Sequence, residues 1–195
     1  MKYKLTDETK EYLGITLHRI MCVTAFAGVS VGDLGGWIEN ENNLSQFGDA
    51  WVYGDAWVYG NAKVYGDAKV YSNAWVYGNA EVSGDAWVSG NAKVSGDAWV
   101  HGEAWVSGDA KVSGEADYIV LKNNWSSGRH FTYTLSNDKW KVGCFYGSGE
   151  ELIAKAYKDS ELSGDCYKAA VEFVEKIKEA KKKAEATEDS DGNQG

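Results

Sequence analysis

Gly48-Asp-Ala-Trp-Val-Tyr53 and Gly60-Asn-Ala-Lys-Val-Tyr65 are two copies of a six-residue repeat that runs from Gly48 to Ser113, eleven copies without a break. The first position is Gly except at Ser72, and the second is Asp, Asn or Glu. The third is always Ala, the fifth is always Val, the fourth is Trp, Lys or Glu, and the sixth is Tyr, Ser or His. A fixed short period usually dictates the architecture of a chain. The repeat is therefore the element around which the rest is organised.

Each repeat predicts a short strand followed by a bend. Ala and Val are two residues apart, so in an extended segment they point to one side while the residue between them points to the other. Gly tolerates positive φ, and Asp or Asn side chains favour turns. Three such strands close a coil of eighteen residues, and successive coils stack at the inter-strand spacing of ~4.8 Å. The sequence thus predicts a mainly β chain with a parallel β-helix of about four coils and an Ala/Val core.

The repeat resembles the hexapeptide-repeat superfamily of left-handed β-helices. The resemblance lies in an aliphatic residue followed four positions later by a small one, as in Val52 and Ala56 or Val58 and Ala62. It implies left-handed coils, against the general preference for right-handed crossovers. Rods of this superfamily commonly associate side by side, so the resemblance also implies a homo-oligomer, with a trimer favoured.

Residues 1–47 are expected to cap the β-helix and lead into it. Apolar residues favour strands at 2–5 and 15–23, separated by the polar stretch 6–10. The glycines of 31–39 allow sharp bends, and Trp37 and Ile38 in this segment are expected to plug the first coil. The β-helix itself is expected over 48–117.

Residues 118–182 predict a further domain, a β-meander followed by two helices. Side chains alternate in 130–135 and 140–146, which favours antiparallel strands. Ser148-Gly-Glu-Glu151 has the spacing of a capping box and predicts a helix to about Tyr157. A second helix with an apolar stripe is expected after a cap at 163–165. Residues 183–195 are rich in Lys, Glu and Asp and are expected to form a disordered tail.

Composition excludes several classes of partner. The formal net charge is −9 and the chain has two arginines, Arg19 and Arg129, which argues against binding to nucleic acid or anionic lipid. It has no apolar run that could span a membrane and no signal-peptide pattern, so a soluble cytosolic protein is expected. The three cysteines, Cys22, Cys144 and Cys166, are odd in number and widely spaced, which favours buried free thiols over a disulfide or zinc site.

A second resemblance covers nearly the whole chain. It rests on Met1-Lys-Tyr-Lys-Leu5, Thr16-Leu-His-Arg-Ile20, Gly32-Asp-Leu-Gly-Gly-Trp-Ile-Glu39, Asn43-Leu-Ser45, the hexapeptides and Val142-Gly-Cys-Phe-Tyr-Gly147. These segments resemble a family of phage and prophage proteins whose members are often labelled acetyltransferases or polymer-forming proteins. The resemblance implies a viral accessory protein that acts in the cytosol of a bacterial host.

Coils of eighteen residues stack the outward side chains into columns. The fourth positions form three columns: Trp51, Lys69, Trp87 and Trp105; Trp57, Trp75, Lys93 and Lys111; and Lys63, Glu81 and Trp99. Stacked aromatic rings stabilise such a rod by ~0.5–1.5 kcal/mol per pair, whereas exposed indoles and phenols also anchor ligands and subunits. The residues assigned to ligand or interface binding are Trp51, Tyr53, Trp57, Tyr59, Lys69, Tyr71, Trp75, Tyr77, Trp87, Trp105 and Arg129.

The second positions place a column of carboxylates, Asp49, Asp67, Asp85 and Glu103, on one corner. The favoured interpretation is that each side chain bonds the backbone of its own turn. A column of divalent cations and mimicry of a nucleic-acid backbone are the alternatives.

The histidines bear on catalysis. Hexapeptide acyltransferases, which this rod resembles, use a histidine as general base, and carbonic anhydrases of the same superfamily bind a metal through three. The chain contains His18, His101 and His130, of which only His101 lies in the repeats. A three-histidine metal site is therefore not expected, and His101 is the candidate base. No phosphate-binding, nucleophile-elbow or dinucleotide motif occurs, so no cofactor is expected.

These observations favour a non-catalytic, oligomeric binding scaffold. The first hypothesis is counter-defence: the scaffold sequesters a nucleotide-like immune signal in inter-subunit clefts. In such a cleft Trp or Tyr would stack on a base for ~1–3 kcal/mol, and Lys63, Lys69 or Lys93 would meet phosphate. The alternatives are an inhibitor that binds a host protein through the Trp columns or the acidic corner, a structural spacer, and an acyl-CoA-dependent acyltransferase that uses His101. The C-terminal domain adds Arg129, His130, Trp125 and Trp140 as candidates, with Trp140 expected in the core.

Overall fold

A computed structural model describes residues 1–191, with side chains to residue 184. The chain divides into two compact units, one of residues 1–122 and 129–146, the other of residues 123–128 and those from 147 onward. The β-meander therefore belongs to the unit that contains the repeats, whereas the sequence grouped it with the helices. Among the described residues, no helix is long and apolar enough to cross a membrane.

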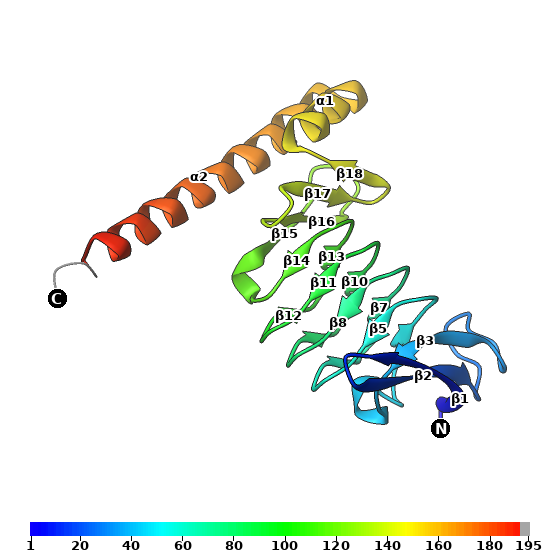
Figure 1. Cartoon of the computed structure of the whole chain (residues 1–195). Helices are drawn as coiled ribbons and strands as arrows, with labels where there is room; N and C mark the ends of the chain where they lie inside the picture. Colours follow the sequence, from blue (N-terminus) through cyan, green and yellow to red (C-terminus); the bar gives the residue numbers. More distant parts are fainter. Residues whose placement is uncertain (192–195) are drawn as a thin grey trace. The chain divides into compact units, whose positions relative to one another are not determined.

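The repeats fold into stacked three-sided coils, called the rod below (Figure 1). Each repeat contributes a two-residue strand: β4 (Trp51–Val52), β5 (Trp57–Val58), β6 (Lys63–Val64), β7 (Lys69–Val70), β8 (Trp75–Val76), β9 (Glu81–Val82), β10 (Trp87–Val88), β11 (Lys93–Val94), β12 (Trp99–Val100), β13 (Trp105–Val106) and β14 (Lys111–Val112). Parallel ladders join β4-β7-β10-β13, β5-β8-β11-β14 and β6-β9-β12. Trp87 pairs with Lys69 on one side and Trp105 on the other, so the eighteen-residue period is confirmed.

The interior of the rod is alanine and valine, as predicted. Every third-position Ala and fifth-position Val of the repeats is at most 1% exposed. The bends also follow the prediction, since each first-position glycine from Gly48 to Gly108 has positive φ. Ser72 takes the place of a glycine in this series and adopts the same conformation, with φ of 63°.

Hydrogen bonds give the rod a direction. Each coil donates backbone N–H groups to carbonyls of the next coil, as in Trp51 N to Ala68 O at 3.0 Å and Lys69 N to Ala86 O at 2.9 Å. The carbonyl oxygens of the first coil therefore have no preceding coil to donate to them. The N–H groups of the last coil have no following coil to accept from them. Buried backbone groups left without partners are costly, so the two ends need caps of opposite character.

Donors cap the first end and acceptors cap the second. Lys2 Nζ donates to Ala50 O (2.8 Å) and Gly48 O (3.2 Å), and Asn43 Nδ2 donates to Gly60 O and Ala62 O. At the other end three side-chain oxygens accept from backbone N–H groups: Thr132 Oγ1 from Trp105 (2.9 Å), Ser136 Oγ from Lys111 (2.7 Å) and Asp117 Oδ2 from Ser113 (2.7 Å).

The N-terminal cap is an antiparallel sheet of β1 (Tyr3–Tyr12), β2 (Ile15–Cys22) and β3 (Leu34–Ile38), followed by a short 3-10 turn, Glu41–Asn43. Strand β3 then pairs in parallel with β5 and joins the cap to the rod. The turn between β1 and β2 has positive φ at Leu13 and Gly14, the geometry of a two-residue hairpin.

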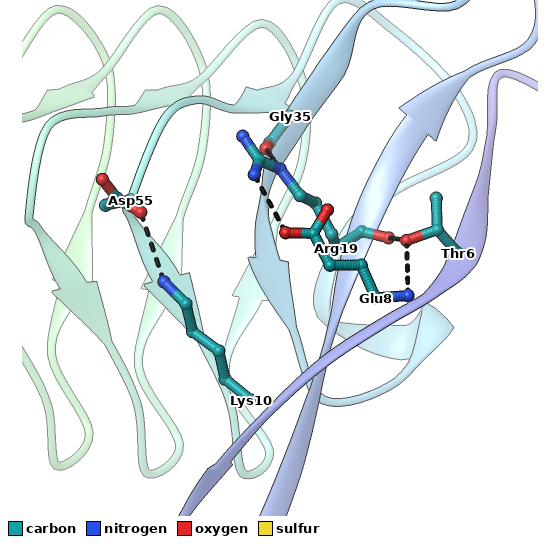
Figure 2. Close-up of polar contacts among 6 residues, drawn as sticks. All are labelled: Thr6, Glu8, Lys10, Arg19, Gly35 and Asp55. Carbon is teal, nitrogen blue, oxygen red and sulfur yellow. Dashed lines mark hydrogen bonds and ion pairs between the residues drawn. The ribbon is translucent and has the colours of Figure 1, made fainter.

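The expectation of a polar connection at 6–10 is wrong, because these residues lie within β1. Their side chains have partners on β2 and β3 (Figure 2). Thr6 Oγ1 donates to Arg19 O (3.0 Å), and the Arg19 guanidinium contacts Glu8 Oε1 (3.3 Å) and Gly35 O (3.2 Å). The polar side chains of 6–10 thus belong to a hairpin whose register shifts between Leu5 and Thr9, a stretch that hydrophobicity alone does not mark as a strand.

The meander consists of β15 (Tyr118–Lys122), β16 (His130–Thr134), β17 (Lys139–Val142) and β18 (Phe145–Gly147), after a 3-10 turn at Glu115–Asp117. Trp140 is 2% exposed and lies in its core, as expected. Thr132 is also buried, because it caps the rod. Cys144 is exposed and Cys166 half-buried, so burial of the free thiols holds for Cys22 alone.

The second unit contains α1 (Gly149–Asp159) and α2 (Glu161–Asp191). The capping box of Ser148 and Glu151 is present as predicted, with both reciprocal bonds. Helix α2 starts before the expected cap at 163 and continues through 183–191. The expectation of disorder is therefore wrong for 183–191, where five of the nine residues are Lys, Glu or Ala, which are strong helix formers. Residues 192–195 of that expected tail lie outside the described residues.

Candidate binding groove

The side of the rod that carries Trp57 and Trp75 forms an aromatic ladder. These two indoles stack at 4.9 Å with an interplanar angle of 2°, and Tyr59 stacks on Tyr77 at 5.2 Å. Stacking along the rod is thus confirmed for both pairs. Tyr12 of β1 lies edge-on against both indoles, at 5.2 Å and 5.3 Å. The chain's own hairpin therefore packs on this ladder.

Lys10 fastens the hairpin to the same side. Its Nζ lies 4.1 Å from the Trp37 ring centroid and 3.3 Å from Asp55 Oδ1 (Figure 2). Tyr59 is only 9% exposed, and burial raises its pKa to about 12. Tyr59 is assigned to binding from the sequence, but in the structure it is a residue of the rod that packs against Tyr12 of the cap.

Trp51 is also buried, at 1% exposed, between Tyr3 (6.1 Å) and Phe26 (5.4 Å), with Tyr53 beside it at 6.4 Å. Its assignment to an outward binding surface is wrong. The reason is that β1 and the loop containing Phe26 cover the first coil, which the spacing of the repeats does not reveal.

Four of the other residues assigned to binding lie together in a groove of about 500 Å³ along β7, β10 and β13. The groove brings together Lys69, Trp87, Trp105 and Arg129, all assigned to binding from the sequence, with the whole carboxylate column. The lining is Asp49, Asp67, Lys69, Asp85, Trp87, Glu103, Ala104, Trp105, Arg129, His130 and Gly143. From the repeat pattern alone, the Trp column and the acidic corner are expected as separate surfaces. They are neighbouring walls of one groove because the second position of each repeat lies in the bend and the fourth lies on the strand that follows it.

The indole wall already attracts ammonium groups. Trp87 and Trp105 meet edge to face at 4.9 Å and 67°, and Tyr71 approaches Trp87 at 5.8 Å. Lys141 Nζ lies 4.0 Å from the centroid of Trp105 and Lys69 Nζ 5.5 Å from that of Trp87. Burial lowers the pKa of Lys141. Cations are drawn to the negative face of an indole ring, and here the chain's own Lys69 and Lys141 supply them.

The acidic wall is only partly neutralised. Glu103 Oε2 lies 2.6 Å from His130 Nδ1, and Lys2 lies near enough to Asp49 and Asp67 for both carboxylates to raise its pKa against the effect of burial. Asp67 Oδ1 accepts from Asp49 N at 3.0 Å. That bond joins neighbouring coils, so the favoured interpretation, in which each carboxylate bonds its own turn, does not hold for Asp67.

At the other two corners of the rod, the second-position side chains bond to each other. Side-chain amides there form ladders between coils: Asn61 to Asn79 to Asp97, and Asn73 to Asn91 to Asp109, with bonds of 3.0–3.4 Å. The groove corner has Asp or Glu in all four coils and no amide to donate. Its stacked like charges repel each other, a cost that the amide ladders of the other corners reduce.

His101 is the candidate general base by sequence, but the structure places a different histidine beside a carboxylate. His101 is exposed beside the Trp99 ring (4.6 Å), whereas His130 is the histidine that pairs with a carboxylate. Both line a shallow depression next to Tyr118. Within the described part of the chain, no group of three or more His, Cys, Asp or Glu side chains is arranged to hold a metal ion.

Several other candidates lie outside the groove. Lys63 pairs with Glu81 at 3.7 Å, and Lys93 lies over the Trp75 ring at 4.4 Å. Trp125 packs edge-on against Tyr167 at 5.1 Å in the second unit.

A family model described as YdcK Beta solenoid repeat matches residues 86–102. The rod is a β-solenoid. The chain is also similar to the Uncharacterized acetyltransferase YdcK of Escherichia coli (strain K12), with 32% identity over 60 residues, or 27% of this chain and 18% of that protein. The aligned part thus spans less than a fifth of the relative's length.

Proposed function

We propose that this protein is a non-catalytic binding protein whose solenoid groove takes a cationic ligand. The observation that carries this proposal is the meeting of an uninterrupted carboxylate column with two indoles that already hold ammonium groups. Carboxylates attract a cation over a distance, and indole faces bind it after water has been displaced.

The charge of the groove decides between ligand classes. Its four carboxylates outnumber the two permanent cations of the lining, Lys69 and Arg129. The nucleotide-like signal suggested first by the sequence would bring its phosphates against these carboxylates, so a cation fits better. The alternative of a partner docked on the Trp column and acidic corner agrees with the groove, provided that the docked part is basic. Phage origin and counter-defence stay expectations of the resemblance.

Calorimetric titration of the full chain tests the proposal. Tetralysine is the cationic probe and ATP the anionic one, each at about 50 mM salt so that surface charges are not screened. We expect tetralysine to give a heat of binding and ATP to give none. In Trp87→Ala the heat of binding of tetralysine should be lost. Trp99→Ala is the matched control, because Trp99 is an exposed indole on another side of the rod. The proposal would be contradicted if ATP bound in a way that depends on Trp87, or if tetralysine gave no heat of binding.

One observation favours acyl transfer as a second candidate. His130 Nδ1 is held by Glu103, which leaves Nε2 to take a proton from an acceptor, the arrangement of a general base with its orienting carboxylate. The relative's printed name, acetyltransferase, points the same way. Release of free thiol from acetyl-CoA in the presence of amines measures this activity. Loss in His130→Ala with retention in His101→Ala would support it, and absence of turnover would leave the binding function.

We also propose that the homo-oligomer expected from the resemblance is a trimer. Light scattering would then report about three times the chain mass of 21.4 kDa. A mass of one chain at micromolar concentration would argue against it.

A further inference from the structure

We propose that helix α2 carries a docking surface for a second copy of this chain, and that the two α2 helices pack antiparallel with Phe173 at their centre. This inference goes beyond the proposed function, because it concerns the second unit and not the groove. Three features carry it: an apolar stripe that is exposed in the single chain, the symmetry of that stripe, and the charges along one of its flanks.

One face of α2 packs within the second unit. Tyr167 and Val174 on this face are at most 7% exposed, and a Cβ at Gly164 would overlap the Tyr157 ring of α1. Helix α1 has 11 residues and α2 has 31, so α1 reaches along about a third of α2 (Figure 1). Within the described part of the second unit, most of the longer helix therefore has no helix beside it.

A second face of α2 is apolar and exposed. Leu162 is 61% exposed and Phe173 is 50% exposed, and the other residues of this face are exposed or half-buried. The stripe consists of Leu162, Cys166, Ala169, Phe173, Ile177, Ala180 and Ala184. At 3.6 residues per turn these side chains lie within an arc of about 80° that contains no charged residue. A continuous exposed apolar stripe is typical of a surface that binds another protein.

The stripe has the same spacing in both directions from Phe173. Its other members lie 4, 7 and 11 residues before that phenylalanine and 4, 7 and 11 residues after it. An antiparallel pair centred there places every member opposite another member: Leu162 opposite Ala184, Cys166 opposite Ala180, and Ala169 opposite Ile177. Each branched aliphatic side chain thus meets an alanine, which lets the two helices approach closely. The two Phe173 rings meet at the centre.

The charges along one flank of the stripe are complementary in the same arrangement. In an antiparallel pair this flank faces the same flank of the other copy, which runs in the opposite direction. It carries Asp165 and Glu172 before the centre, and Lys176 and Lys183 after it. Glu172 then lies beside Lys176 of the other copy. Asp165 likewise lies beside Lys183, and both pairs have an offset of about 3 Å along the axis, which long side chains span. Glu179 points further away, about 120° from the centre of the stripe.

The central charges of this flank are available in the single copy. Among the described residues, neither Glu172 nor Lys176 forms an ion pair. A parallel pair would set this flank against the opposite one, where Val174 is buried by the chain itself and Lys181 would approach Lys176. The charges therefore favour the antiparallel pair.

Disulfide cross-linking of the full chain tests the direction of the pair. The background is Cys144→Ser, which removes the exposed thiol of the meander, while Cys22 is buried. In this background Ala180→Cys should form a disulfide with Cys166 of the other copy under mild oxidation, and the product should run as two chains on a denaturing gel. Without Ala180→Cys the same oxidation should give no two-chain product, because Cys166 then faces an alanine.

Light scattering over a range of protein concentrations tests the pair itself. The helix pair should appear as a doubling of the mass on raising the concentration, whatever number of chains the rods assemble. Phe173→Glu changes an exposed position, so it should abolish the doubling and keep the helical circular dichroism signal. Glu172→Lys should weaken the pair about tenfold, because attraction becomes repulsion at two symmetric contacts. The charge swap Glu172→Lys/Lys176→Glu is the matched control and should restore the pair.

The outcomes separate this inference from the proposed function, which the tetralysine titration tests. A two-chain product from Cys166 alone would indicate a parallel pair and would overturn the inference. Absence of the product in Ala180→Cys would mean that the stripe faces something other than a second α2, and would overturn it too. A doubling that persists in Phe173→Glu would assign the association to another surface, with the same consequence.

Discussion

Lys2 Nζ donates to Ala50 O across 2.8 Å, and the side chain that carries this charge is only 6% exposed. Burial lowers the pKa of Lys2 from 10.5 to about 8, while Asp49 and Asp67 act in the opposite direction. Between those two values the unfolded chain binds more protons than the folded one. The free energy of unfolding should therefore rise with pH in that window.

We expect the gain to be about 1–2 kcal/mol between about pH 7.5 and pH 9.5, measured by urea denaturation. Above about pH 10 the trend should reverse, because Tyr59, with its pKa raised to about 12, stays protonated in the fold but ionises in the unfolded chain. Lys2→Met is the control. It should be less stable at every pH and should lack the rise; a rise of the same size in this variant would assign the effect to another group.

Ser72 offers a stabilising change. It occupies the bend position with φ of 63°, a conformation that costs a residue with a Cβ. Removing this strain in Ser72→Gly should raise the free energy of unfolding by about 0.5–1 kcal/mol. The larger conformational entropy that glycine gives the unfolded chain should reduce this gain. The reverse change one coil further, Gly90→Ser, should destabilise, because a Cβ there would lie 2.9 Å from Gly108 N. Thermal melts compare the stability of both variants with that of the wild type. A higher melting temperature for Gly90→Ser would contradict the prediction.

Thr132 should be essential to the end of the rod. Its hydroxyl is the acceptor for Trp105 N, and the side chain is 1% exposed. Thr132→Val keeps the shape but leaves that N–H without an acceptor, which should cost about 1–3 kcal/mol. Thr132→Ser, which keeps the hydroxyl, should lose less. Chemical denaturation compares the three proteins; equal losses in the two variants would show that the methyl group matters more than the bond.

Salt should stabilise the wild-type rod through the carboxylate column. Asp49, Asp67, Asp85 and Glu103 repel one another at the coil spacing, and added salt screens exposed charges of this kind. The melting temperature should rise between about 20 mM and 500 mM NaCl. Asp85→Asn should melt higher at low salt and depend less on salt. An unchanged salt dependence in this variant would place the repulsion elsewhere in the acidic chain.

The rod could be predicted almost completely from the sequence, because its determinants are local. The Ala and Val positions fix the interior, Gly fixes the bends, and the period fixes which residues stack, as Trp87 on Trp105 shows. The capping box at Ser148 is another local signal, and it too was confirmed.

The rest depends on contacts between segments that are distant in sequence. The burial of Trp51 depends on Tyr3 and Phe26, neither of which belongs to the repeat. The lining of the groove includes His130 and Gly143, which lie in the meander segment outside the repeats. The sequence supplied four lining residues of the binding list and also the carboxylate column. Only the structure shows that the two line one groove, and this neighbourhood changes the proposed ligand from an anion to a cation.

The directional hydrogen bonding of the coils has a consequence for assembly. Without its caps, the rod would expose unpaired carbonyl groups at one end and unpaired N–H groups at the other. These two ends are complementary, so versions shortened by both caps could bind each other end to end. Lys2, Asn43, Thr132 and Ser136 fill the two ends with their own polar atoms. These four side chains thus occupy the backbone groups through which one rod could otherwise extend another.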